Sequence, residues 1–280
     1  MNGQLGAFSF VDRIVAVEPG LRARGRFAIP AGIEAFPAAL VAESLGQLAA
    51  WSAMAAVGFQ RRPVAALAGL VQIFDEPRPG QALDLSIELQ QAEADAIAYG
   101  GLAQVDGRPF LRLTDCVGPM LPMTEFDDPQ TVRERFALLC GAGAVPGRFA
   151  GLPCLPLQFG ATDSGQELRA SLQVPESADF FADHFPRRAV LPGTLLIDAM
   201  LRLAIRLAAD AALGLPAERL LPSHVSHVKL RTFIPPGEAV DLAASLEEVG
   251  DREVVLGVSA RVGRKPVAGA RITLGRGAAA

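Results

Sequence analysis

Only three histidines occur in this sequence, and one of them, His184, lies in a segment rich in residues that restrict the backbone. Imidazole titrates near neutral pH, so His184 is a candidate for accepting or donating a proton in catalysis. A lone histidine is also a common structural hydrogen-bonding group. The residues around His184 are therefore needed to distinguish a catalytic role from a structural one. The segment is Asp183-His184-Phe185-Pro186-Arg187-Arg188-Ala189-Val190-Leu191-Pro192-Gly193.

Pro192 and Gly193 end this segment and open a predicted apolar helix. The backbone amides of a helix's first turn have no partner inside the helix, and the helix dipole adds positive potential there. Such a place can stabilise an oxygen that acquires negative charge. The segment therefore combines a titratable ring with a candidate oxyanion site.

Two carboxylates lie near the starts of two apolar stretches. Asp198 follows His184 by 14 residues, and Glu43 precedes Asp198 by 155 residues. A carboxyl group on an apolar helix is desolvated, so its pKa rises and it can act as an acid near neutral pH. The alternative for Glu43 is an exposed first-turn residue that gains about 0.5 kcal/mol from the helix dipole. Gln47, one turn later on the same face, either bonds the acid, lines a tunnel or makes an ordinary polar contact.

The elements that must position these residues occur twice along the chain. Residues 38–59 and 194–214 are apolar but interrupted by charged and polar side chains, which predicts buried core helices and not membrane spans. Each is followed by a strand, a Pro-Gly turn and a strand of alternating residues, and the glycines of the two turns, Gly80 and Gly237, are 157 residues apart. One duplication accounts for both units.

The chain is predicted to divide into two domains joined by a linker. Residues 1–124 form the first unit, residues 125–152 the linker, and residues 153–280 the second unit. A wider region rich in Pro and Gly, residues 118–156, surrounds this boundary. A short helix is predicted at residues 130–139, because Asp127 and Asp128 can cap it and Pro129 fits its first turn.

Composition excludes several classes of protein. A chain of 280 residues with 50% hydrophobic residues suits two globular domains, and a net charge of −4 disfavours binding to nucleic acid. Cys116, Cys140 and Cys154 show no metal-binding spacing, and His224 and His227 are expected on opposite faces of one strand. We therefore expect no metal site. The first ten residues lack the pattern of a secretion signal, so a cytoplasmic location is expected.

The segment from His184 to Asp198 resembles the active-site motif of the β-hydroxyacyl-acyl-carrier-protein dehydratases of the FabA/FabZ type, in which His-Phe-Pro, a valine, Pro-Gly and an acid recur. The first half resembles the same family in residues 10–20 and 40–47, with Glu43 at the acidic position. Residues 33–37, Ile-Glu-Ala-Phe-Pro, stand there in place of the histidine motif. The resemblance implies an α+β double hotdog fold, with two repeats that each wrap an antiparallel sheet around a long helix.

The resemblance also implies how the site is assembled. In the family, each site takes its histidine from one hotdog and its acid from the partner hotdog. Applied to this chain, that rule predicts one composite site with His184 as base and Glu43 as acid. The carbonyl of Val190 would orient the His184 ring, and Gly193 would supply a backbone amide. Asp198, left without a histidine, is expected to be a relic or a structural group, and its pairing with His184 is the competing assignment.

The activity implied by the resemblance is dehydration of a 3-hydroxyacyl thioester, carried on acyl carrier protein or coenzyme A, to a trans-2-enoyl thioester. Such a lyase acts in fatty acid biosynthesis or related lipid metabolism and uses no metal or other cofactor. The chain would form a pseudo-dimer by itself, with room for a further homo-oligomer, and would not insert into membranes. The alternatives are a hotdog thioesterase and a non-catalytic protein that binds acyl chains or supports an assembly.

Overall fold

A computed structural model describes residues 6–152, 155–160, 165–211 and 220–276. Cys154 lies outside these residues. The first half contains β1 (Arg13–Glu18), β2 (Arg22–Ala28), α1 (Ala38–Ala56), β3 (Arg61–Pro63), β4 (Leu67–Ile73), β5 (Ala82–Ala92), β6 (Ala96–Val105) and β7 (Arg108–Pro122). The connecting region contains the 3₁₀ helix η1 (Met123–Glu125) and α2 (Pro129–Cys140).

The second half repeats the plan of the first. It contains β8 (Leu157–Phe159), β9 (Glu167–Gln173), the 3₁₀ helix η2 (Asp179–Ala182), α3 (Gly193–Asp210), β10 (Leu220–Leu230), β11 (Ala239–Val249), β12 (Glu253–Val262) and β13 (Lys265–Arg276). In both halves one long helix precedes a series of antiparallel strands. The predicted duplication and the α+β double hotdog are confirmed.

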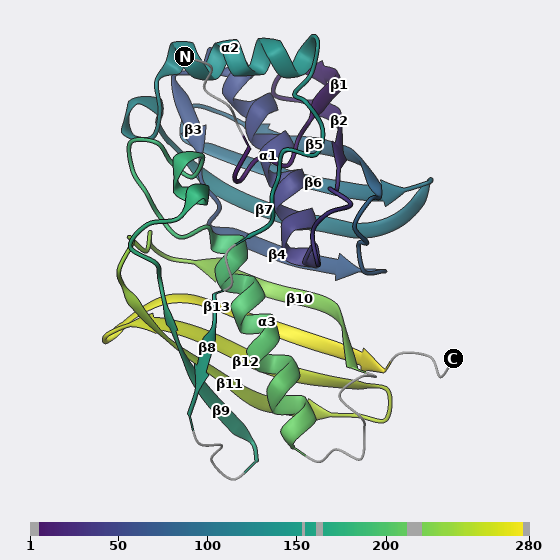
Figure 1. Ribbon diagram of the computed structural model, residues 1–280, viewed down its shortest axis with the longest axis vertical. Coiled ribbons are helices and arrows are strands. Elements are labelled where there is room, and N and C mark those ends of the chain that lie inside the picture. Colours follow the sequence, from purple (N-terminus) through teal and green to yellow (C-terminus); the bar gives the residue numbers. More distant parts are fainter. Residues whose placement is uncertain (1–5, 153–154, 161–164, 212–219, 277–280) are drawn as a thin grey trace.

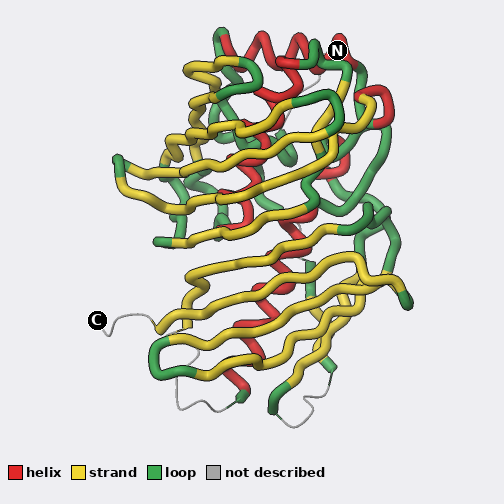
Figure 2. Tube along the Cα trace, turned by 180° about the vertical axis from the view of Figure 1, so that it is seen from behind, coloured by secondary structure: helices red, strands yellow, loops and turns green. Residues whose placement is uncertain are grey.

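The two halves share one sheet. Its strand order is β1-β2-β5-β6-β7-β4-β10-β13-β12-β11-β9-β8, with β3 paired separately to β7. The halves join where β4 and β10 pair antiparallel, with Val71 opposite Val225. Figures 1 and 2, which show opposite sides, place α1 and α3 on the same side of this sheet, and the two helices contact each other. Pairing at β4 and β10 removes two exposed sheet edges and brings the starts of both helices together.

Alternating burial along the strands forms the core under each helix. In β5, Leu83, Leu85 and Ile87 are buried while Asp84 is exposed, so one face of the sheet packs on α1. In the second half, α3 buries a corresponding row of apolar side chains against β9 to β13. No helix in the described ranges has the length and hydropathy to cross a membrane.

Three local predictions differ from the structure. The segment at residues 10–20, which resembles the family's opening strand and turn, becomes strand only at Arg13, because Phe10 and Val11 are buried in the core and the Asp12 carboxylate accepts the Ala28 amide. β7 extends to Pro122, so the first residues of the Pro- and Gly-rich region are strand.

The third difference concerns His224 and His227, which do not follow simple alternation. A β-bulge shifts the register between Ser226 and Lys229, and His227 has a φ of 53°. Because of this bulge, Val225 and Val228 are both buried although they are three residues apart. The bulge breaks the simple alternation on which the expectation of opposite faces for the two histidines rested. No cluster of three or more potential metal ligands occurs within the described ranges.

Candidate active site

His184 lies in the loop between η2 and α3, and hydrogen bonds close this loop around it. The backbone amide of His184 donates to the Phe180 carbonyl at 3.0 Å, and the Val190 amide donates to the His184 carbonyl at 3.3 Å. The ring Nδ1 lies 3.3 Å from the Val190 carbonyl oxygen, which can only accept a hydrogen bond. This contact assigns the proton to Nδ1 and leaves Nε2 unprotonated. Val190 therefore stands where the predicted orienting role requires it.

Two aromatic rings contact the His184 imidazole. The ring stacks on Phe185 with a centroid distance of 4.1 Å and meets the edge of Phe8 at 5.5 Å. Burial among these groups lowers the pKa of His184 to about 4, and the positive charge of Arg62 acts in the same direction. The imidazole is therefore neutral, and able to accept a proton, at any pH above about 4.

Glu43 occupies the first half of α1, and both of its carboxylate oxygens accept hydrogen bonds. Gln47 Nε2 donates to Oε1 at 3.0 Å, and Thr194 Oγ1, from α3, donates to Oε2 at 2.8 Å. Burial raises the pKa of Glu43, although these two bonds and the charge of Arg62 oppose the rise. The alternative of an exposed first-turn residue is therefore excluded.

His184 and Glu43 line the same cavity, which has a volume of about 230 Å³. Its wall comes from both halves and includes Val190, Gly193 and Gln47 among the predicted site residues. Apolar side chains supply much of the remaining wall, among them Leu111, Leu113, Leu201, Val225 and Val228. The arrangement places one candidate base and one candidate acid beside a space that suits an acyl chain.

Asp198 lies on α3 but is absent from the residues that line this cavity. Its Oδ2 accepts a hydrogen bond from Arg202 Nε at 3.1 Å, and Arg202 also donates to the Leu155 carbonyl. Burial raises the pKa of Asp198, while Arg202 opposes the rise. Within the described residues, the carboxylate thus serves a local ion pair.

Gly193 allows α3 to begin close to β10. A Cβ atom at this position would collide with the end of the Leu230 side chain, so a larger residue here would require that side chain to move. The amides of Gly193 and Thr194 have no hydrogen-bond partner among the described residues, whereas the amide of Leu195 donates to the Pro192 carbonyl. The first turn of α3 therefore offers free donors at the cavity.

Arg62, on β3, is a site residue that the sequence reasoning missed. It lines the cavity, and its guanidinium carbon lies 4.4 Å from the centre of the Phe185 ring, a cation–π geometry. Its side chain has no hydrogen bond or ion pair within the part of the chain described here, and burial lowers its pKa to about 10. In the sequence, the adjacent pair Arg61 and Arg62 follows the apolar helix by a few residues, and this pair was the signal that could have pointed to a site residue.

Replacing Arg62 with methionine is expected to raise the pKa of His184 above about 4, because a positive charge that disfavours the imidazolium is lost. The titration of the His184 ring can be followed by NMR in the unliganded protein. Arg61→Met is the matched control, since Arg61 bonds the Met120 carbonyl and is not among the charges that shift His184. An unchanged His184 titration in Arg62→Met would show that the arginine does not act on the ring.

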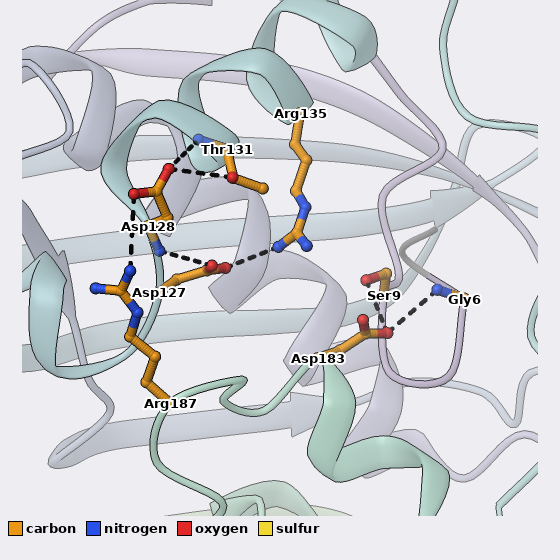
Figure 3. A network of polar contacts seen from close by, with 8 residues as sticks. All are labelled: Gly6, Ser9, Asp127, Asp128, Thr131, Arg135, Asp183 and Arg187. Atoms are coloured by element: carbon orange, nitrogen blue, oxygen red, sulfur yellow. Dashed lines mark hydrogen bonds and ion pairs between the residues drawn. The ribbon is translucent and has the colours of Figure 1, made fainter. Parts of the chain in front are cut away.

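An N-terminal strap, residues 6–10, lies between the loop of His184 and α1 and is hydrogen-bonded to both. Asp183 Oδ2, next to His184, accepts from the backbone amides of residues 6, 7 and 8 at 3.2, 2.9 and 2.8 Å. Figure 3 shows Asp183 turned toward Gly6 and Ser9, with the Asp127–Arg135 ion pair nearby. At its other end, the strap bonds Gln47 through Phe8 and Phe10. The strap therefore links the loop of His184 to the helix of Glu43.

The predicted short helix anchors the linker beside this loop. Asp128 is the N-cap of α2 and accepts from the Thr131 amide at 2.9 Å, while Pro129 begins the helix. Asp128 also faces Arg187 of the active-site loop, with 3.7 Å between the charged atoms (Figure 3). Phe126 packs edge-on against Phe185 at 4.9 Å. The linker thus supports the segment that carries His184.

Part of the chain is similar in sequence to known dehydratases. The sequence pattern of the ApeI dehydratase family matches residues 161–262. A 3-hydroxyacyl-[acyl-carrier-protein] dehydratase FabZ of Albidiferax ferrireducens is 33% identical over 88 residues, which are 31% of this chain and 59% of the relative. The FabZ of Rickettsia felis is 26% identical over 86 residues, with the same two shares. The chain thus spans about 59% of the length of these two curated relatives.

Solved structures match nearly the whole chain. A structure described as an oleoyl thioesterase of Lactobacillus plantarum has a TM-score of 0.61 at 14% identity and covers 93% of this chain and 98% of its own. An acyl-ACP thioesterase of Bacteroides thetaiotaomicron has a TM-score of 0.53 at 12% identity and covers 90% and 97%. These structures establish the fold, and the sequence matches confirm the resemblance to the FabZ-like hotdog dehydratases.

Proposed function

We propose that this chain, a double hotdog that resembles the FabZ-like dehydratases, removes water from a 3-hydroxyacyl thioester and forms a trans-2-enoyl thioester. The observation that carries the proposal is one cavity lined by His184 from the second half and by Glu43 from the first. A base and an acid are both needed, because the reaction removes a weakly acidic C2 proton and expels a poor leaving group from C3.

In the proposed reaction, Nε2 of the neutral His184 ring takes the C2 proton. The electrons of the C2–H bond form the double bond, and the C3–O bond breaks as Glu43 protonates the hydroxyl, which leaves as water. His184 then carries a proton and Glu43 a negative charge, and transfer of the proton from His184 to Glu43 through solvent restores both groups.

Negative charge develops on the thioester oxygen when the C2 proton leaves. The amides of the first turn of α3 and the guanidinium of Arg62, which have no partner within the described residues, suit this oxygen. Ala38 at the start of α1 also lines the cavity and is the competing amide donor. The thioester would be carried by acyl carrier protein or coenzyme A, in fatty acid biosynthesis or a related pathway.

The pKa values define a pH window for the proposed pair. His184 must be neutral, and it is neutral above about pH 4. Glu43 must be protonated, and because its pKa is raised, it stays protonated to a higher pH than an ordinary glutamate does. Activity is therefore expected to fall on the acid side as His184 protonates and on the alkaline side as Glu43 ionises.

The test supplies the purified chain with one 3-hydroxyacyl group as a coenzyme A thioester and as an acyl-carrier-protein thioester. Formation of the conjugated enoyl product, followed by its absorbance, is the expected result, and hydration of the enoyl thioester is the reverse reaction. Release of free thiol would instead identify a thioesterase. Binding of the thioester without either reaction would identify a non-catalytic acyl-binding protein and overturn the proposal.

A further inference from the structure

The two carboxylate oxygens of Glu43 have partners of different chemical kinds. Oε1 faces the amide of Gln47 on the same helix, and Oε2 faces the hydroxyl of Thr194, 151 residues away on α3. An amide NH₂ group can only donate a hydrogen bond, whereas a hydroxyl can donate or accept. This difference determines which oxygen can carry the proton.

The backbone of the strap fixes the orientation of the Gln47 amide. Gln47 Oε1 accepts from the Phe10 amide at 2.9 Å, and Nε2 donates to the Phe8 carbonyl at 3.0 Å as well as to Glu43. Rotating the amide by 180° would set its oxygen against two acceptors and its NH₂ group against a donor. Gln47 is therefore a fixed donor to Glu43 Oε1.

A fixed donor favours the carbonyl form of the oxygen that it contacts. In a protonated carboxyl group the carbonyl oxygen is the better acceptor, so the bond from Gln47 makes Oε1 the carbonyl oxygen and Oε2 the hydroxyl. Thr194 can then turn its hydroxyl to accept from Oε2–H. When Glu43 is ionised, the same hydroxyl donates to Oε2.

We propose that Glu43 carries its catalytic proton on Oε2 and that Thr194 is the residue that positions this proton. The Thr194 hydroxyl accepts a hydrogen bond from Oε2–H before the reaction and donates one to Oε2 after it. This inference rests on the proposed function, since it assigns an atom to the acid step. The Oε2–H bond breaks as the substrate hydroxyl takes the proton, and the charge left on Oε2 is met by the Thr194 hydroxyl. Thr194, from the second half, thus contacts the proposed acid of the first half.

Other titratable groups also surround Glu43. Arg62 from β3, His184 from the loop before α3, Tyr99 from β6 and Cys116 from β7 all line the same cavity. Burial raises the pKa of Glu43 while the positive charge of Arg62 opposes the rise, and burial, with a smaller contribution from the charge of Glu43, raises the pKa of Tyr99. A test of Thr194 must therefore leave these four groups in place.

The experiment compares Thr194→Val with Thr194→Ser in the full chain. Valine keeps the shape and loses the hydroxyl, so kcat for dehydration is expected to fall roughly 10- to 100-fold, by analogy with the loss of a residue that orients a metal ligand, while KM changes little. Loss of a donor to the ionised form raises the pKa of Glu43, so the alkaline limb of the pH profile moves upward. Serine keeps the hydroxyl and is expected to restore both properties.

Thr114→Val is the matched control, because Thr114 lies on β7 and is not itself part of the cavity wall. Thermal unfolding of all variants checks that the fold is kept. The titration of the Glu43 carboxyl is also measured directly, by NMR of protein labelled at the glutamate side chains, without substrate. An unchanged Glu43 titration in Thr194→Val overturns the role of Thr194 whatever the activity, whereas a wild-type chain that dehydrates no thioester overturns the proposed function.

Discussion

Replacing His184 with alanine is expected to lower kcat/KM for dehydration by roughly 10³-fold, within the range of about 10²- to 10⁴-fold that general acid–base groups contribute. The reason is that the proposed base is lost while the cavity keeps its apolar wall. Initial rates with a 3-hydroxyacyl thioester measure the effect. His224→Ala is the matched control, because His224 lies on β10 and is not part of the cavity wall. A His184→Ala protein with full activity would remove the ring from the mechanism.

The second large effect is expected from Glu43→Gln, which should lower kcat/KM by a similar factor, roughly 10²- to 10⁴-fold. Glutamine retains the shape and can still bond Gln47 and Thr194, so the change removes the proton and little else. Asp198→Asn is the matched variant, because it makes the same chemical change on α3 outside the cavity. It should leave most of the activity.

Opposite results from this pair would reassign the acid. Loss of activity in Asp198→Asn with retention in Glu43→Gln would mean that His184 works with the acid of its own half. The ion pair of Asp198 with Arg202 is partly exposed, with side-chain exposures of 24% and 40%, so its disruption is expected to change the free energy of unfolding by about 1 kcal/mol or less. Unfolding in urea separates that effect from catalysis.

A second site of the same kind is not expected in this chain, because the first half uses the corresponding position for packing. Phe36, in the segment that stands in place of the histidine motif, is 2% exposed. Its ring lies 5.7 Å from Phe10, 5.5 Å from Phe27 and 5.9 Å from Phe149. This aromatic cluster gives the first half core stability where the second half has His184. We therefore propose one working site per chain.

Local features of the sequence were sufficient to predict the elements of the fold. The alternation in β5, the Pro-Gly turns and the apolar helices depend on contacts between near neighbours, and all were identified correctly. The cap of α2 by Asp128 followed from the same kind of reasoning. The bulge at His227 was missed, although the spacing of three between Val225 and Val228 departs from the alternation of a regular strand.

The sequence also identified His184, Val190 and Gly193, since one short loop holds all three. The partners of Glu43 depended on the tertiary structure. Thr194 meets Glu43 across 151 residues, and Arg62 enters the cavity from a strand with no recognisable motif. These contacts exist because β4 pairs with β10 and sets α1 beside α3. Residues close together in the sequence specify the loop that holds His184. The pairing of β4 with β10 decides that Glu43, and not Asp198, lines the cavity beside it.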